Sequence, residues 1–338
     1  MKSIKVLGMA LLGMSIIMAS CSGEDGKDGL PGDKGDKGAQ GDQGPKGDQG
    51  DQGEQGEQGV PGEDKPNVDF YFQDGFKGYN GTHDTYINEQ ATSTNYDGED
   101  LTIGYNTTLD RSRHTIIRFD GIDGVTSDLV ESGESCTDGF YINQATLYVY
   151  LSNYGKVGVG TNQPAIQLYC GFYNGGTDDP VFEETDATWN MANANDAWFV
   201  AGGVSALFDY GLTAAVDDYI VPIQFNEAGI GTGAIGWVAI PLPRTLVSQW
   251  ICTPESNKGM RIRFEETEVN ANCDTITINF ESSESDNLDL RPLLVIETED
   301  IDPAAGKMAP SSKAKDWDNM SYEEKMAPLY RYFAAKGL

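Results

Sequence analysis

Carboxylates are the most abundant reactive groups in this chain of 338 residues. The sequence holds 53 Asp and Glu against 23 Lys and Arg, a formal net charge of −30, and two histidines, His83 and His114. This balance argues against a nucleic-acid partner, because phosphate binding needs a basic surface. It is compatible with an acidic surface that is simply solvated or that binds cations.

The motifs of common enzyme classes are missing from the sequence. It contains no Cys-x-x-Cys, His-Glu-x-x-His, Gly-x-Ser-x-Gly or Walker-type phosphate loop. Hydrolysis of polysaccharides needs two positioned carboxylates, and nothing in the sequence singles out such a pair. We therefore expect a protein that is not an enzyme.

Two kinds of side chain could form a binding site. The oxygens of Asp286, Asn287 and Asp289 are suited to Ca²⁺, the one cofactor that the sequence suggests, although an ordinary solvated turn is the alternative. Aromatic rings could stack on sugars. Two clusters are candidates for this: Tyr71, Phe72, Phe76 and Tyr79, and Phe172 and Tyr173 with Asn174.

Four cysteines after residue 100 suggest two disulfides, as is common in exported proteins. Three pairings are open, and the two short loops favour Cys252–Cys273 and Cys136–Cys170. Buried free thiols are the alternative.

Residues 1–20 have the pattern of a signal peptide, with Lys2 and Lys5 before an apolar run. Met18-Ala19-Ser20-Cys21 follows and resembles a lipobox, which implies that Cys21 is lipidated. An ordinary secretory signal with an incidental cysteine is the alternative. Two or more acyl chains would anchor the protein stably in a lipid bilayer.

The residues after Cys21 bear on localisation. Ser22 is similar to the sorting signal of outer-membrane lipoproteins, and Ser22-Gly23-Glu24-Asp25 resembles the surface-export signals of Bacteroidota lipoproteins. These resemblances imply an outer-membrane lipoprotein exposed at the cell surface.

Glycine occupies every third position from Gly23 to Gly62, fourteen times without a break. This is the collagen repeat, which exists because only glycine fits at the axis of three packed polyproline-II chains. Residues 21–65 are therefore expected to form the lipid anchor and a collagen-like Gly-X-Y stalk. The stalk is either a homotrimeric rod or a charged single-chain tether.

Residues 66–300 are expected to fold as an antiparallel β-sandwich, a jelly roll, making the class all-β. β-Branched and aromatic residues alternate in short segments between turns. The strands expected are Asp84–Asn88, Asp100–Tyr105, His114–Asp120, Gln144–Leu151, Ala165–Tyr173, Trp237–Pro241, Gly259–Glu265, Asp274–Glu281 and Leu293–Glu297. A short helix is expected near Pro243–Trp250.

Several short motifs follow one another along residues 78–298. They are Asp84-Thr85-Tyr86-Ile87, Asn95-Tyr96, Ile117-Arg118-Phe119-Asp120, Glu184-Thr185-Asp186-Ala187-Thr188-Trp189, Phe280-Glu281-Ser282-Ser283-Glu284 and Arg291-Pro292-Leu293. This order resembles DNRLRE domains, β-sandwiches grouped with carbohydrate-binding modules. The resemblance implies a glycan ligand and marks Asp84, Asn95, Arg118, Trp189, Glu284 and Arg291 as family-motif residues.

A structural role is expected for most of these matched residues. Arg118 alternates with two apolar neighbours, and Arg291 lies among acidic residues, so both predict an ion pair or hydrogen-bond clamp. Trp189 is expected to be a core residue, and a platform for sugar stacking is the alternative.

The C-terminal part divides into a linker, residues 301–320, and a helix, residues 321–338. Ser321 and Glu324 have the spacing of a capping box, and apolar residues follow at helical intervals up to Leu338, with Pro328 among them. The helix is expected to pack on the head, and docking of a partner is the alternative.

The sequence therefore supports two hypotheses. The first is a non-catalytic cell-surface lipoprotein whose β-sandwich head binds polysaccharide or another glycan. The second is a structural or adhesive surface protein whose head binds proteins or mediates trimerisation.

Overall fold

The computed structural model describes residues 68–98, 100–106, 108–130, 135–136, 140–157, 166–172, 180–204, 219–223, 236–264, 275–300 and 316–338. All of them lie in the second of two units into which the chain divides, Pro61–Leu338. The predicted signal peptide, Cys21, the Gly-X-Y segment, Cys273 and most of the 301–320 linker lie outside the described residues.

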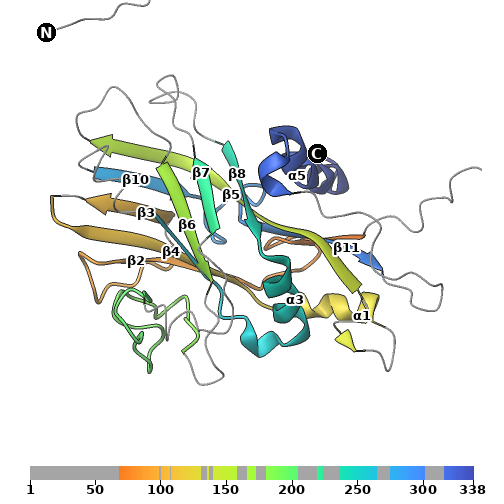
Figure 1. Cartoon of the computed structure of the whole chain (residues 1–338). Helices are drawn as coiled ribbons and strands as arrows, with labels where there is room; N and C mark the ends of the chain where they lie inside the picture. The colour runs from red at the N-terminus through yellow and green to blue at the C-terminus, as the bar shows by residue number, and fades with distance from the viewer. Residues whose placement is uncertain are drawn as a thin grey trace, which may run out of the picture. The chain divides into compact units, whose positions relative to one another are not determined.

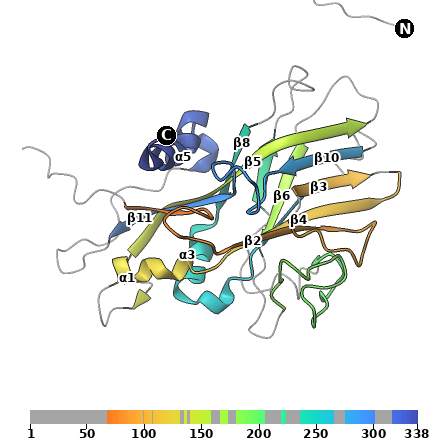
Figure 2. The same cartoon turned by 180° about the vertical axis from the view of Figure 1, so that it is seen from behind.

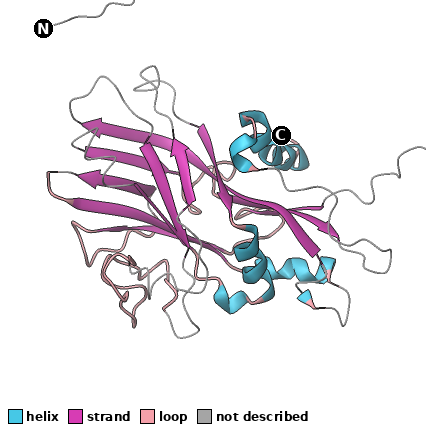
Figure 3. Cartoon of the chain, in the orientation of Figure 1, coloured by secondary structure: helices cyan, strands magenta, loops and turns pink. Residues whose placement is uncertain are grey.

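The described residues form antiparallel strands and a few short helices (Figures 1 and 3). The strands are β1 (Val68–Phe72), β2 (Thr82–Asn88), β3 (Leu101–Asn106), β4 (Arg111–Phe119), β5 (Phe140–Val157), β6 (Ile166–Phe172), β7 (Tyr219–Ile223), β8 (Gly236–Leu242), β9 (Met260–Phe264), β10 (Thr275–Phe280) and β11 (Leu293–Asp300). The α-helices are α1 (Thr126–Leu129), α3 (Arg244–Cys252) and α5 (Tyr322–Lys336), and the 3₁₀ turns are η1 (Ile122–Val125), η2 (Pro254–Ser256) and η4 (Trp317–Asn319).

The strands connect in the order β1-β11-β5-β10-β3-β4-β9-β6-β7, with β2 added to β4 and β8 added to β5. The long strands β4 and β5 change partners along their length, so the sheet folds over itself. In Figure 1, β6 and β7 pass in front of the layer that holds β10, β3 and β4, and β8 lies beside β5. The predicted all-β sandwich with a short C-terminal helix is confirmed.

The core lies between the two layers and is built by alternation along the strands. In β10, Ile276, Ile278 and Phe280 are buried while the threonine and asparagine residues between them are partly exposed. Side chains of β3, β4, β5, β8, β9 and α3 fill the same core. Alternation of this kind buries one face of each strand, and burial supplies most of the stabilising free energy.

Each of the nine predicted strands corresponds to an observed strand, and the predicted short helix is α3. Two strands were missed, β1 and β7. β1 has the sequence Val-Asp-Phe-Tyr-Phe, whose aromatic residues were interpreted as a sugar-binding cluster rather than as a strand.

The predicted disulfide pairing is wrong, because Cys136 is bonded to Cys252, with a Cα–Cα distance of 5.6 Å. Neither Cys252–Cys273 nor Cys136–Cys170 can therefore form. The reason is tertiary packing: α3 packs in the same core as η1 and Val130, so its end lies beside Cys136 although 116 residues separate the two cysteines. The side chain of Cys170 and all of Cys273 lie outside the description.

Helix α5 begins at the predicted capping box, with Ser321 Oγ accepting from Glu324 N and Glu324 reaching back to Ser321 N. It continues through Pro328 and ends at Gly337, whose φ of 81° closes the helix. In both views it lies against the side of the sheet that carries β8 and β11 (Figures 1 and 2). The prediction that this helix packs on the head is therefore confirmed.

Among the residues that the structure describes, no helix is long and apolar enough to cross a membrane.

Candidate functional site

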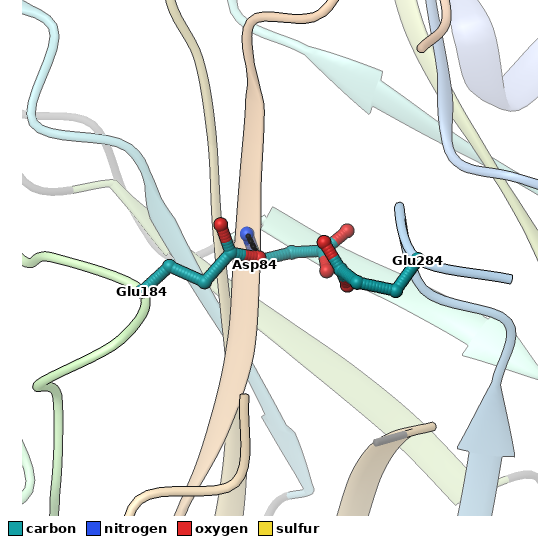
Figure 4. Close-up of side chains that lie close together, drawn as sticks. All are labelled: Asp84, Glu184 and Glu284. Atoms are coloured by element: carbon teal, nitrogen blue, oxygen red, sulfur yellow. Dashed lines mark hydrogen bonds between the residues drawn. The ribbon is translucent and has the colours of Figure 1, made fainter. Parts of the chain in front are cut away.

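Three carboxylates from distant parts of the chain meet beside strand β2. Asp84 lies on β2, Glu184 in the 180–204 loop and Glu284 in the turn after β10, and one oxygen of each lies within 4.8 Å of the others. Figure 4 shows the Asp84 carboxylate directed toward Glu284 and the Glu184 carboxylate directed toward the Asp84 backbone. We call these three residues the carboxylate triad.

The backbone of β2 explains the position of Glu184. Among the described strands β2 pairs with β4, so the N–H groups on its other edge can donate to side chains outside the sheet. The N–H of Asp84 donates to Glu184 Oε1 at 3.1 Å. The 180–204 loop thus covers the strand edge and carries a carboxylate into the site.

Ser283 holds the Asp84 side chain. Its backbone N–H donates to Asp84 Oδ2 at 3.0 Å, and its hydroxyl lies 3.2 Å from Asp84 Oδ1 and 2.7 Å from Glu284 Oε1. Asp84 is only 1% exposed. Burial, followed by the nearby charges of Glu284 and Glu184, raises the pKa of Asp84 well above its usual range.

Glu284 is more exposed than Asp84, yet its pKa is also raised, first by burial and then by the charge of Glu184. Three carboxylates this close repel one another unless a proton or a cation lies between them. They supply part of the oxygen shell that a hard cation such as Ca²⁺ prefers. The triad could therefore either share protons or hold a divalent cation.

A second group of charges lies next to the triad. His83 Nδ1 is 3.5 Å from Glu184 Oε2, and His83 Nε2 is 3.3 Å from Asp120 Oδ2. Hydrogen bonds to Asp120 and Glu184 raise the pKa of His83 to about 9, so it is protonated at neutral pH. Burial alone would raise the pKa of Asp120, but hydrogen bonds from His83 and Arg118 outweigh it and lower that pKa to about 2.

Arg118 has the clamp role predicted for it. It is 4% exposed, its Nε lies 2.7 Å from Asp120 Oδ1, its Nη2 lies 3.1 Å from Asp120 Oδ2, and it also donates to the carbonyl of Phe182. It therefore ties β4 to the loop that carries Glu184.

Asn95 and Trp189 position the same loop. Asn95 Nδ2 donates to the carbonyls of Glu184 at 2.7 Å and Ala187 at 2.9 Å. Trp189 is 8% exposed and packs with Ile87 and other apolar residues in a small second core. The prediction that Trp189 is a core residue is confirmed, and it does not form a sugar platform.

The other predicted residues lie away from the triad. Arg291 Nε donates to the carbonyl of Ser285 at 2.9 Å, so it closes the turn after β10. The Asn287 side chain accepts from Asp289 N, and Asp289 pairs with Lys336 of α5. Within the described residues, three acidic side chains come close enough together to hold a metal ion at the triad. Asp286, Asn287 and Asp289 stay a prediction as Ca²⁺ ligands.

The aromatic cluster predicted at residues 71–79 packs against two cores, with Phe72 buried and the other three rings partly buried. Phe72 belongs to the main core, Tyr79 packs against that core, and Tyr71 and Phe76 lie under α5. The four rings therefore contribute to packing and are divided between two cores. The other predicted cluster, at residues 172–174, lies outside the described side chains.

An aromatic pair that the sequence did not reveal lies near Asp84. The rings of Tyr86 and Tyr96 are stacked, with centroids 4.1 Å apart, and both side chains are half-buried. Tyr86 is two residues from Asp84 on β2 and so points to the same face of the strand. Their separation of ten residues in sequence gave no periodic signal.

One family model matches part of this chain. It describes the collagen triple helix repeat (20 copies) and matches residues 20–68. No curated protein matches the chain. The predicted collagen-like stalk is thus supported by the comparison, and the match ends at the residue where β1 begins.

Proposed function

We propose that the protein is a non-catalytic cell-surface lipoprotein with a structural or adhesive role, in which a collagen-like stalk presents a β-sandwich head. The observation that carries the proposal is the order of the two parts: the match to the collagen repeat ends at residue 68, and the described sandwich begins there. Long repeats of this kind serve as spacers, and a head at the end of a spacer is placed to contact something outside.

A homotrimer follows from the same repeat, because collagen repeats associate as three chains. Three heads on one stalk would bind several weak sites at once, which raises overall avidity without any new contact. Analytical ultracentrifugation of the full chain at several concentrations is the test. A trimer with a collagen-type circular dichroism signal supports the proposal, and a monomer at every concentration contradicts it.

The anchor is proposed to be an acylated Cys21 after removal of residues 1–20, in the outer membrane and facing outward. The support is the Met18-Ala19-Ser20-Cys21 sequence and the acidic residues after it. Mass spectrometry of the N-terminal peptide should find acyl chains on Cys21, and Cys21→Ser should release the protein from the membrane fraction. Unmodified Cys21 in the membrane fraction would contradict the anchor.

A glycan is our more specific proposal for the ligand of the head. Its support is the order of motifs shared with DNRLRE domains, together with a half-buried tyrosine pair beside a group of carboxylates. Aromatic faces stack on sugars, and a cation on carboxylates could bridge to acidic sugars.

A glycan array, with alginate among the ligands, tests this idea on the full chain with Ca²⁺ and with a chelator. Tyr96→Ala should lose binding, whereas Tyr330→Ala, an exposed tyrosine on α5, should not. Failure to bind any acidic or neutral glycan under either condition would leave protein adhesion as the role of the head.

A further inference from the structure

Strand β1 is the element through which the stalk joins the head. It is the first described strand after the collagen repeat, and among the described strands it lies at the end of the order and pairs with β11. The pairing runs over five residues, from Val68 opposite Thr298 to Phe72 opposite Leu294. Any pull on the stalk therefore enters the head through a short edge strand.

The register of this pairing contains a repulsive contact. Asp69 lies directly opposite Glu297, so two carboxylates face each other on the same side of the strand pair. Like charges at directly opposed positions destabilise a strand pair. Glu297 is partly shielded from water. Burial and the charge of Asp69 both act to raise its pKa.

Helix α5 supplies the charge that removes this repulsion. Arg331 Nε lies 2.7 Å from Asp69 Oδ2, and Arg331 Nη2 donates to Glu297 Oε1. One guanidinium thus bonds to both strands at one pair of opposed residues. Its planar fork suits two carboxylates held side by side.

Other α5 side chains secure β1 beyond that pair of residues. The rings of Tyr71 and Tyr332 are 5.3 Å apart, and Tyr332 donates a hydrogen bond to Gln73, which is fully buried just after β1. The opposite face of β1 packs on the main core through Phe70 and Phe72. β1 is therefore held between the core and α5.

We propose that α5 is a latch for β1: by pairing Arg331 with both Asp69 and Glu297, it keeps the stalk-bearing strand in the sheet when the stalk is under tension. The tension rests on the proposed function, but the latch itself is a property of the folded head.

Hydrogen exchange of the full chain tests the latch without reference to the stalk. Arg331→Ala should speed exchange of the β1 and β11 amides by about tenfold, because a charged hydrogen-bonded contact is lost and the carboxylates repel again. Arg331→Gln keeps the length of the side chain and serves if the alanine variant does not fold. The β3 and β4 amides should be unchanged.

Two further variants separate the latch from general destabilisation. Arg111→Ala is the matched control, because Arg111 is 48% exposed against 46% for Arg331 and also pairs with a glutamate, Glu89, away from β1. Adding Asp69→Asn to Arg331→Ala should slow β1 exchange again, since one of the opposed charges is gone. Unchanged β1 exchange in Arg331→Ala, or no recovery with Asp69→Asn, overturns the proposal.

Force spectroscopy tests the use of the latch. The chain is held by its N-terminus and by a handle at Leu109, an exposed residue before β4. β1 should detach at lower force in Arg331→Ala than in the unchanged protein and in Arg111→Ala. Equal forces would overturn the role under tension. A monomeric chain in ultracentrifugation would instead contradict the proposed function and leave the exchange result intact.

Discussion

His83 lies between Asp120 and Glu184 and carries a proton at neutral pH, which gives the stability of the head a defined pH dependence. Its pKa is about 9 in the folded protein against 6.5 for an ordinary histidine. A raised folded pKa contributes stability that is fully present below about pH 6.5 and is lost as the pH rises through about 9.

We expect His83→Gln to unfold more easily than the unchanged protein at pH 6, by about 1 kcal/mol after allowance for solvent screening of this partly exposed site. At pH 10 the two proteins should differ little. Urea unfolding at both values measures this. An equal difference at pH 6 and pH 10 would mean that the histidine contributes through packing and not through charge.

Asp84 has a linkage of the same sign as His83, and it starts at a lower pH. Its folded pKa lies well above the ordinary value of 3.8, so the folded state holds the proton more tightly and stability falls as the pH rises from about 4 toward the folded pKa. Asp84→Asn keeps an oxygen that accepts from Ser283 N and removes the charge. The free energy of unfolding of the variant should therefore exceed that of the unchanged protein by about 1–3 kcal/mol. This is the range for burial of an imperfectly compensated polar group.

The measurement is the unfolding free energy of both proteins at pH 4.5 and pH 8, with a chelator present. A difference that does not change with pH would contradict the raised pKa of the buried Asp84. If the variant is more stable than the unchanged protein with chelator but not with added Ca²⁺, a cation binds the triad.

Single residues were predictable from sequence where local context decides their role. Arg118 between two apolar neighbours was expected to point away from them, and Trp189 after a Thr-rich segment was expected in a core. Glu184 was quoted within a motif but not identified as part of a site. Its partners, Asp84 and Glu284, are about a hundred residues away on either side, and no spacing rule reports such a meeting.

At the scale of elements, the Cys136–Cys252 bridge joins α3 to the segment before β5. Cys136→Ser should lower the unfolding free energy by about 2–4 kcal/mol, because a cross-link over a long loop restricts the unfolded chain. Chemical denaturation measures the loss, and Cys136→Ser with Cys252→Ser should lose no more than the single variant. Peptide mapping without reduction checks the pairing, and a 252–273 linked peptide would contradict it.

Strands and helices were predictable where the sequence is periodic. Which cysteines pair was not predictable. Alternation located β2 to β6 and β8 to β11, and the spacing of Ser321 and Glu324 located the start of α5. β1 was missed because five residues with three aromatic rings show little alternation. The predicted disulfide pairing was wrong because it rested on loop length. Loop length sets the entropy of closing a loop, whereas the packing of α3 decides which sulfurs meet.

At the scale of the whole molecule, the Gly-X-Y segment is charged as well as periodic. Residues 23–64 hold twelve Asp and Glu and four Lys, a net charge of −8 for each chain (4 − 12 = −8). Three such chains side by side repel one another, and salt screens that repulsion over about 10 Å at 0.1 M.

The collagen-type circular dichroism transition should therefore move to higher temperature between 10 mM and 150 mM NaCl, while the unfolding of the head, followed by tryptophan fluorescence, should shift less. A variant with Asp51→Asn, Glu54→Gln and Glu57→Gln should show a weaker salt effect. A transition that falls in temperature as salt is added would mean that Lys–Asp attraction between chains outweighs the net charge.

The division into stalk and head was visible from composition, since the glycine period stops at Gly62 and β-branched and aromatic residues follow. The function of the head was less predictable, because a β-sandwich serves many roles and its site depends on which loops meet.

The bond between Cys136 and Cys252 also affects how the head would respond to proteases. The two sulfurs close a covalent ring that contains β5, β6, β7, β8 and all of α3. A single cut at any peptide bond inside that ring, for example after Lys156, leaves both halves joined through sulfur. A nicked head would therefore remain attached to its stalk, and the cut would show on a gel only after reduction.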